Sequence, residues 1–179
     1  MASSPAVSPQ PSPDQIMNFA HRAVADLSAA MCGPLLYIGD RLGIFKSMAG
    51  AGPVTCHQLA QSTGLNERYL REWLSSMTAA QYVAYDPAAQ TFTLPPENAA
   101  VLTDENSPFF VGGLAQMVPD HYRLLPETIR CFQHGGGVPY SSFGEDTFIG
   151  TERLFRTGYV NFLAHQWLAA MPELYAKLQ

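Results

Sequence analysis

The sequence predicts a mainly α fold with a small β-hairpin wing, namely a winged helix-turn-helix with additional helices. The segment from Val54 to Leu94 carries this prediction. A short helical pattern, a glycine turn, a second amphipathic helix and two short alternating segments follow one another there. Along most of the remaining chain, apolar residues recur at helical spacing. The main question is therefore what this winged helix does.

The composition limits the classes of protein that fit. The chain has 179 residues, of which 47% are hydrophobic, and this is enough for a core in one or two small domains. The net charge is -5, and only 10 residues are Lys or Arg. Because nonspecific affinity for nucleic acid comes from clustered basic residues, this balance argues against nucleic acid as a partner.

Neither a membrane nor an oxidising compartment is indicated. No apolar stretch approaches the roughly 18 residues of a membrane span, and the N-terminus has no basic segment followed by an apolar one. Cys32, Cys56 and Cys131 are far apart, odd in number and outside any metal-ligand spacing, so they are interpreted as core or semi-buried thiols in a reducing compartment. The expected location is the cytoplasm.

The chain is expected to begin with a disordered leader and a helix. Residues 1–13 are mostly Ser, Pro and Ala, a composition that buries little surface. Asp14 is a good N-cap for an amphipathic helix that closes before Gly33 and Pro34. The apolar stripe of this helix consists of Ile16, Phe19, Ala23 and Leu27.

A second helix is predicted over residues 35–49. Its apolar stripe consists of Leu35, Ile38, Leu42, Phe45 and Met48. Gly39 and Gly43 lie inside this pattern, although a glycine costs about 1 kcal/mol relative to alanine in a helix. We therefore expect these glycines to mark close packing by another helix.

The winged helix follows, with start and stop signals for both of its helices. Thr55 can cap a short helix, Gly64 supplies the left-handed turn, and Asn66 caps a long helix. In the short helix, Leu59 and Ala60 are expected to face inward.

The long helix is predicted to have an apolar face and a charged face. The apolar face consists of Tyr69, Leu70, Trp73, Leu74 and Met77, and the charged face consists of Arg68, Arg71 and Glu72. Two alternating segments, 82–85 and 91–94, then form the wing hairpin around a Pro-Ala-Ala-Gln loop.

A DNA reader would place this long helix in the major groove. However, Glu67 and Glu72 offset Arg68 and Arg71, and the wing contains no Lys or Arg. The positive charge that phosphate contacts need is therefore missing from this surface. The residues favour a scaffold or a contact between subunits.

The segment after the wing is predicted to be buried, helical connecting structure. Its apolar content is too high for a surface linker, and Pro108, Pro119 and Pro126 are expected to break it into helical pieces. Asp104 and Glu105 are interpreted as a solvated helix boundary.

The last part of the chain combines a loop and two more helices. Residues 134–144 form a loop by composition, and helices are predicted from about Thr151 and from Pro172. The chain reaches Gln179 without a glycine or asparagine to end the last helix, so it looks cut.

No residue is assigned to catalysis or to metal binding. The 5 histidines include no pair at metal-binding helical spacing, and none adjoins a Ser or Cys in a nucleophile motif. The triple glycine at 135–137 follows a helix and lacks a Gly-Lys-Ser or Gly-Lys-Thr, so it is interpreted as a loop or pocket lid. His121 and His134 flank segments rich in Met and aromatic residues, which suit an apolar small-molecule pocket or simple packing.

The order of several segments resembles a known family. They read GDRLGIF, PVTCHQLAQSTGLNERYLREWL, YVAYDP, FTLPPENAAVL, DENSPFFVGG and GGGVPYSSFG. This order resembles the N-terminal region of class I S-adenosylmethionine-dependent methyltransferases that carry a winged-helix domain, in the layout of small-molecule O-methyltransferases. The resemblance covers residues 14–179. It implies that the winged-helix part mediates homodimerisation and helps to roof the substrate pocket, and that a Rossmann-like domain follows.

One departure limits what the resemblance implies. The cofactor site of the family begins with a strand, an acidic residue and a Gly-x-Gly-x-Gly loop, which this chain lacks. No cofactor-binding or catalytic residue is therefore carried over. No cofactor is expected in this chain, and S-adenosylmethionine is implied for the complete enzyme. Pocket-roof roles fall by position on Met117, Tyr122, His134, Tyr140 and Phe143.

The resulting hypothesis divides the chain into three parts. Residues 1–13 are a disordered leader, 14–100 a winged-helix dimerisation domain, and 101–179 a helical connector and pocket roof leading toward a missing Rossmann-like methyltransferase domain. The complete enzyme methylates a small molecule, and this chain alone is expected to be inactive. Two alternatives stay open: a winged-helix DNA-binding transcription regulator that senses a small apolar ligand, and a standalone partner of a full-length methyltransferase.

Overall fold

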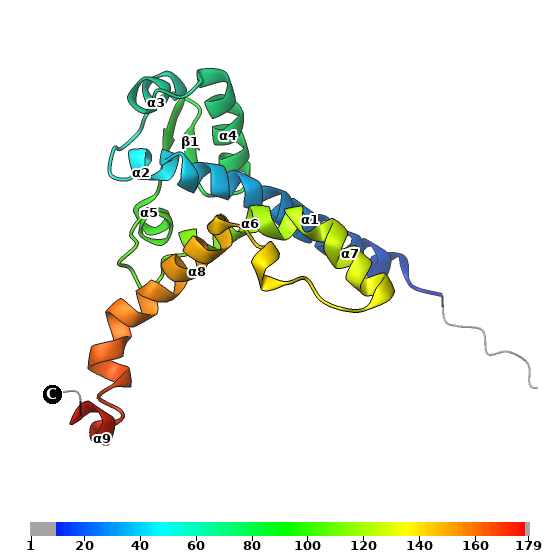
Figure 1. Ribbon diagram of the computed structural model, residues 1–179. Helices are drawn as coiled ribbons and strands as arrows, with labels where there is room; N and C mark the ends of the chain where they lie inside the picture. The colour runs from blue at the N-terminus through cyan, green and yellow to red at the C-terminus, as the bar shows by residue number, and fades with distance from the viewer. Residues whose placement is uncertain (1–9, 178–179) are drawn as a thin grey trace, which may run out of the picture. The chain divides into compact units, whose positions relative to one another are not determined.

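The computed structural model describes residues 10–177, so most of the predicted leader over 1–13 lies outside the described residues. The chain divides between Met31 and Cys32 into two compact units. The described residues are mostly helical and contain one two-stranded antiparallel sheet, which confirms the predicted mainly α fold with a wing (Figure 1). None of the helices in this part of the chain is long and apolar enough to cross a bilayer.

Helix α1 spans Pro13–Arg41, so the predicted stop at Gly33 and Pro34 is wrong. Proline lacks an N–H donor, but its fixed φ angle is already close to helical. Proline normally clashes with the Cβ of the preceding residue, and Gly33 has none. The helix therefore continues through Pro34.

The first unit contains the N-terminal part of α1, residues 13–31. Its large apolar side chains are all more than half exposed, and they are Ile16, Met17, Phe19, Val24, Leu27 and Met31. The predicted stripe of this helix is thus an apolar surface rather than part of a core within the unit.

The second predicted helix is divided at Gly43. The φ angle of Gly43 is 66°, in the left-handed region, and α2 (Ile44–Met48) begins after this turn. Gly39 instead lies inside α1, where a Cβ atom would come within 2.6 Å of Trp73 Cζ2 on the next long helix. Close packing by another helix is therefore confirmed for Gly39, and it is wrong for Gly43, which has open space around it.

The short helix of the winged helix begins as predicted. Helix α3 (Cys56–Thr63) starts at a capping box, in which Thr55 Oγ1 accepts from the Gln58 backbone and the Gln58 side chain accepts from the Thr55 backbone. Gly64, with a φ angle of 70°, then supplies the left-handed turn between the two helices.

The long helix α4 (Glu67–Ala79) begins at Asn66, whose side-chain oxygen accepts two backbone N–H groups. Its inward face consists of Leu70, Trp73, Leu74 and Met77, which are all buried. Tyr69 is 78% exposed, so its predicted place on this face is wrong. Successive helical residues are turned by roughly 100°, which puts Tyr69 at the edge of the buried face.

The wing consists of β1 (Ala84–Asp86) and β2 (Thr91–Thr93), which pair antiparallel. Tyr85 lies opposite Phe92, and the two ring centroids are 4.7 Å apart. Val54 forms a bridge to Phe92 through two backbone hydrogen bonds of 2.9 and 2.8 Å. The wing is thereby joined to the segment that precedes α3.

An apolar core fills the winged helix. Its buried members are Ile44, Phe45, Met48, Leu59, Leu70, Trp73, Leu74, Met77, Val83, Leu94 and Leu102. Phe45 and Trp73 meet edge to face with their ring centroids 5.0 Å apart. Trp73 Nε1 donates a 2.9 Å hydrogen bond to the carbonyl oxygen of Leu35. This bond ties the end of α1 to α4.

The later elements are α5 (Pro96–Leu102), α6 (Gly112–Arg123), α7 (Leu125–His134), the 3₁₀ helix η1 (Tyr140–Ser142), α8 (Glu145–Gly158), the π-helix η2 (Tyr159–Trp167) and α9 (Pro172–Tyr175). Pro126 and Pro172 open helices, but Pro119 lies inside α6, so the break predicted there is wrong. A proline inside a helix loses one hydrogen bond while keeping a helical φ angle. The helix predicted from Thr151 begins earlier, because the two acidic residues of its first turn favour an N-terminus there.

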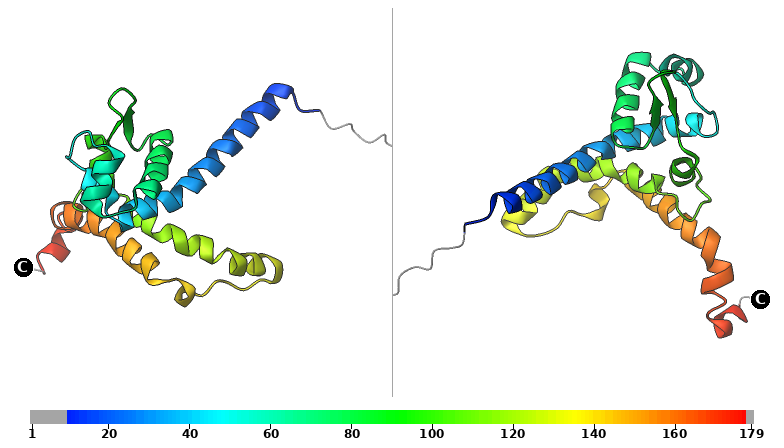
Figure 2. Two further views of the ribbon diagram at one scale, coloured as in Figure 1. Left: turned by 90° about the horizontal axis from the view of Figure 1, so that it is seen from above. Right: turned by 180° about the vertical axis from the view of Figure 1, so that it is seen from behind.

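Helices α6 and α8 pack along each other (Figures 1 and 2). They come close at Gly113 and Gly150, where a Cβ atom on Gly113 would come within 2.8 Å of the Leu154 backbone nitrogen. Small residues therefore set the distance between these helices. The predicted domain boundary at residues 100–101 falls inside α5 and stays a prediction.

Candidate functional site

The exposed face of α4 carries paired charges. Arg68 bonds Glu72 at 3.1 Å, and Arg71 bonds Glu67 at 2.9 Å. His57 Nδ1 lies 3.0 Å from the other oxygen of Glu67, and hydrogen bonds from His57 and Arg71 lower the pKa of Glu67. The two arginines of this helix therefore already have carboxylate partners. The exclusion of nucleic acid as a partner stays a prediction.

The five residues predicted for the pocket roof lie on α6, on α7 and in the loop that follows α7. Tyr140 and Phe143 come together, with ring centroids 6.0 Å apart. Met117 is half-buried against α8, and its sulfur accepts a hydrogen bond of 3.4 Å from a threonine hydroxyl of that helix. Tyr122 and His134 are exposed. The role of these five residues in binding stays a prediction.

Two further rings join Tyr140 and Phe143. Phe148 of α8 lies edge to face on Tyr140 at 5.0 Å, and His121 lies against Phe143 at 5.7 Å. We call these four residues the aromatic cluster. His121 Nδ1 lies 2.9 Å from the Met117 carbonyl oxygen, which can only accept, so Nδ1 donates this bond and Nε2 of the neutral ring is an acceptor. The cluster thus combines an apolar surface with one polar acceptor.

Asp120 holds the C-terminal end of the glycine-rich loop, residues 135–144, which joins α7 to α8. It is 6% exposed and accepts hydrogen bonds from Thr147 Oγ1 at 2.7 Å, from the Gly144 backbone at 2.7 Å and from Arg123 at 2.7 and 3.0 Å. The hydrogen bond from Thr147, helped by Arg123 and Gly144, lowers the pKa of Asp120. Arg123 also donates to the Ser142 carbonyl oxygen at 2.7 Å. We call this set of contacts the Asp120 clamp.

The N-terminal end of the same loop has open space around its glycines. Gly135 and Gly136 have φ angles of 75° and 87°, and a Cβ atom on either of them or on Gly137 would meet no atom within 4 Å. The loop is therefore held through the Asp120 clamp at one end and follows α7 at the other. Its predicted role as a pocket lid is compatible with this attachment and stays a prediction.

A largely apolar cavity of about 500 Å³ lies elsewhere in the second unit. Its walls come from α1, α2, the end of α4, α5 and α6, and they include Leu36, Val101 and Val118. Asn98 lies at its edge and donates a 3.0 Å hydrogen bond to the Tyr82 carbonyl oxygen. None of the five predicted roof residues lines this cavity. Sequence reasoning missed it because its Leu, Val and Ala walls have the same pattern as a filled core.

The described residues contain neither a group of metal ligands nor a disulfide. Within residues 10–177, no group of three or more His, Cys, Asp or Glu side chains could hold a metal ion. Cys32, Cys56 and Cys131 are free and half-buried. Burial is the main cause that raises the pKa of Cys56. A thiol with a raised pKa is a poor nucleophile at neutral pH.

Comparison with family models identifies the winged helix. Residues 30–104 match the family model of the Rv2258c-like winged HTH domain. The chain therefore contains a winged helix-turn-helix domain, as predicted from Val54 to Leu94. A comparison with curated proteins finds no match.

Solved structures share the fold over most of the chain. The mitomycin 7-O-methyltransferase MmcR is 20% identical, with a TM-score of 0.61, over 80% of this chain and 45% of that chain. PigF, solved with SAH, is 15% identical, with a TM-score of 0.59, over 80% and 46%. The N,N-8-amino-8-demethyl-D-riboflavin dimethyltransferase RosA from Streptomyces davawensis is 19% identical, with a TM-score of 0.53, over 84% and 45%. This chain thus spans less than half the length of each, and the predicted resemblance to methyltransferases is confirmed for the fold.

Proposed function

We propose that this chain is the subunit-pairing and substrate-pocket region of an S-adenosylmethionine-dependent methyltransferase that acts on a small molecule in the cytoplasm. One observation carries the proposal. The fold shared with MmcR and RosA spans 80% and 84% of this chain but 45% of each of those chains. In this proposal the complete enzyme transfers the methyl group, and these residues alone are inactive.

The described residues do not fit the cofactor. S-adenosylmethionine supplies a methyl group on a sulfonium and needs a seat for its nucleoside, which is usually a strand, a glycine-rich loop and a helix. The sheet in residues 10–177 is the two-stranded wing, and the glycines at 135–137 follow helix α7. No step through the cofactor is therefore assigned to these residues.

The proposed contribution of this chain is to hold the acceptor molecule and to exclude water. The aromatic cluster offers rings for an apolar acceptor, and His121 Nε2 offers a hydrogen-bond acceptor beside Phe143. The Asp120 clamp fixes the backbone on both sides of Phe143 through Ser142 and Gly144. Holding two reactants close in a dry site is the main service that a protein gives to an in-line displacement.

The second part of the proposal is that two copies of the chain pair through α1. The exposed stripe on residues 13–31 is apolar and continuous in its helical spacing. Monomeric proteins rarely leave so large an apolar patch in water. A second copy of the chain is the proposed cover, since two copies present the same stripe and can pair it around a two-fold axis.

Calorimetry and sedimentation test the two parts separately. We expect no binding when S-adenosylmethionine is titrated into the 179-residue chain, and a dimer at micromolar concentration. Micromolar affinity for S-adenosylmethionine would contradict the assignment of the cofactor to another region. Leu27→Glu should give monomers because it places a charge on the stripe, whereas Ala29→Glu, at an exposed position on the opposite side of the same helix, should leave the dimer intact. Equal behaviour of these variants would contradict pairing through α1.

The DNA-binding alternative has less support. Both arginines of α4 bond to glutamates, and the wing between Ala84 and Thr93 has no Lys or Arg. A gel shift with genomic DNA that weakens steeply as salt rises would favour this alternative.

A further inference from the structure

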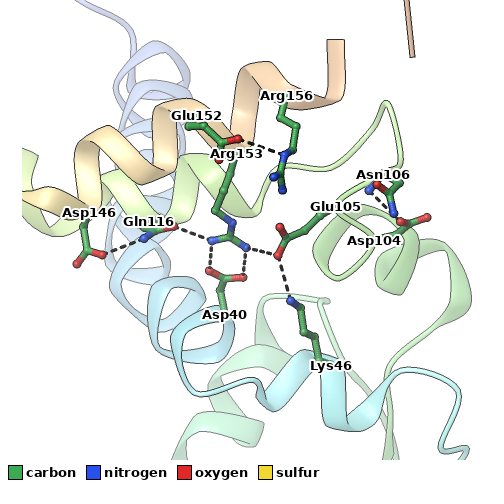
Figure 3. Close-up of polar contacts among 10 residues, drawn as sticks. All are labelled: Asp40, Lys46, Asp104, Glu105, Asn106, Gln116, Asp146, Glu152, Arg153 and Arg156. Carbon is green, nitrogen blue, oxygen red and sulfur yellow. Dashed lines mark hydrogen bonds and ion pairs between the residues drawn. The ribbon is translucent and has the colours of Figure 1, made fainter. Parts of the chain in front are cut away.

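Arg153 of α8 lies at the centre of a polar network that joins α8 to the winged helix (Figure 3). Its side chain is 13% exposed. Both terminal nitrogens bond to Asp40 at the end of α1, with distances of 2.7 and 2.9 Å to the two carboxylate oxygens. This bidentate pairing uses the planar fork of the guanidinium group, which fixes orientation as well as distance.

Three further groups surround the same guanidinium. Arg153 Nη1 donates to Gln116 Oε1 of α6 at 2.7 Å, and Nη2 donates to Glu105 Oε1 at 3.1 Å. Its Cζ atom lies 5.2 Å from the ring centroid of Phe110. Glu105, which the sequence placed with Asp104 at a solvated helix boundary, is thus a half-buried ion-pair partner, so that interpretation is wrong for Glu105, whereas Asp104 is exposed just after α5. One side chain of α8 therefore touches α1, α6 and the segment between α5 and α6.

The network continues on both sides of Arg153. Lys46 of α2 donates to Glu105 at 3.0 Å. Burial alone would raise the pKa of Glu105, but the bond from Lys46 and the charge of Arg153 outweigh burial and lower it. On the other side, Gln116 donates to Asp146 at 2.9 Å, and that residue accepts from Tyr37 at 2.8 Å. Each charged group of this network therefore has a hydrogen-bond partner.

The contacts of α8 with the neighbouring helices show what Arg153 adds. Between α6 and α8, the backbones come close at Gly113 and Gly150, which have no side chains of their own. Glycine contacts let helices come close without fixing how far one is shifted along the other. A buried ion pair adds little stability over apolar packing, and its best-attested role is to select one arrangement. Arg153 lies one turn after Gly150, where it adds a bidentate bond to α1 to the hydrogen bonds that α8 already makes with α6.

We propose that Arg153 is a positioning residue that sets the register and rotation of α8 against α1 and α6, and thereby couples the winged-helix domain to the helix that carries Phe148 of the aromatic cluster. The proposal depends on the contacts of Arg153 and not on methyl transfer. It predicts that loss of the guanidinium loosens α8 while the winged-helix core stays folded.

Hydrogen exchange of the whole chain tests this proposal, with a matched control on the same helix. Arg156 pairs with Glu152 in solvent, with both side chains about half exposed. Arg153→Met should speed amide exchange in α8 by at least about tenfold, because it leaves buried carboxylates without their partner, and leave exchange in α4 unchanged. Arg156→Met should leave both helices as in the wild type. Arg153→Lys should restore only part of the protection, because an ammonium group lacks the planar fork.

Other outcomes would overturn the proposal. Equal exchange of α8 in the Arg153→Met and Arg156→Met variants would mean that Arg153 does not hold the helix. Equally faster exchange in α4 and α8 would mean that it contributes only to global stability. Should Arg153→Met fail to fold, Glu105→Gln removes one charge and keeps the bidentate bond to Asp40. This milder variant should speed exchange in α8 by a smaller factor than Arg153→Lys does, and it should leave exchange in α4 unchanged. Unchanged exchange in α8 would again contradict the proposal.

Discussion

The winged helix and the α6–α8 pair are buried by different kinds of side chain. The winged-helix core is apolar throughout and includes the Phe45 and Trp73 pair. In contrast, the buried polar residues of the described chain lie on α6 and α8, and they are Gln116, Asp120, Thr147 and Thr157. The backbones of the two helices come close at Gly113 and Gly150.

The two kinds of burial contribute differently to the folding free energy and to the arrangement of the helices. Apolar burial is favourable in proportion to area and has no preferred direction. Hydrogen bonds to ionised groups are directional, and their net contribution to stability is reduced by the cost of removing the charges from water. We therefore expect the winged helix to supply most of the folding free energy, and the α6–α8 pair to supply a defined arrangement of the candidate site.

The largest effect is expected in the winged-helix core. Leu74 is 0% exposed, and Leu74→Ala should lower the free energy of unfolding by about 2–5 kcal/mol, because the substitution leaves a cavity. Urea denaturation followed by circular dichroism measures the loss. Ser75→Ala on the exposed side of the same helix is the control and should change stability little. A loss for Leu74→Ala as small as that of the control would contradict the assignment of the core.

An intermediate effect is expected where α6 meets α8. A Cβ atom on Gly113 would meet backbone atoms of Gly150 and Leu154, which cannot move aside as a flexible side chain can. Gly113→Ala should therefore cost about 1–3 kcal/mol through overpacking. Gly137→Ala, where a Cβ atom meets nothing within 4 Å, is the matched control in the same denaturation experiment. Similar midpoints for both variants would show that the helices do not approach at Gly113.

The smallest effect is expected at the Asp120 clamp, and it should depend on pH. Because the hydrogen bond from Thr147 lowers the pKa of Asp120 in the folded chain, its carboxylate contributes stability above the ordinary carboxyl pKa. That contribution is lost as pH falls through the lowered pKa. The melting temperatures of wild type and Asp120→Asn should therefore differ at pH 7, and the difference should begin to shrink near the ordinary carboxyl pKa of about 4 and vanish once pH has fallen through the lowered pKa of Asp120.

Asp26→Asn, at an exposed position of α1, is the control for the acid dependence. It should melt as the wild type does at every pH. A difference between wild type and Asp120→Asn that stays constant from neutral to acid pH would contradict a role for the ionised carboxylate.

Local patterns predicted the winged helix well. Thr55, Gly64 and Asn66 are helix signals that act within a few residues, and each has its predicted role. The wrong predictions lie where the local backbone or a neighbouring residue overrides a general sequence rule. Pro34 continues its helix because the residue before it is a glycine, and Gly43 breaks the pattern because its φ angle is left-handed.

The candidate site was predicted less completely, because its contacts join distant parts of the chain. Tyr140 and Phe143 could be named together because they are close in sequence. Asp120 could not, because its partners Gly144 and Thr147 lie 24 and 27 residues away. Arg153 and Asp40 are 113 residues apart, and one Arg in a helical pattern looks the same whether it faces water or a buried carboxylate.

The single contact face of α8 limits how the length of the chain can vary. Thr147, Gly150, Arg153 and Leu154 point toward the α1 and α6 side of that helix. One residue inserted before Gly150 would turn every later side chain by roughly 100° and separate several of these contacts at once. The same insertion at 135–137 would only lengthen a loop with open space around it, at a small entropic cost. Length variation among close homologues is therefore expected in the glycine loop, whereas α8 should keep a constant number of residues.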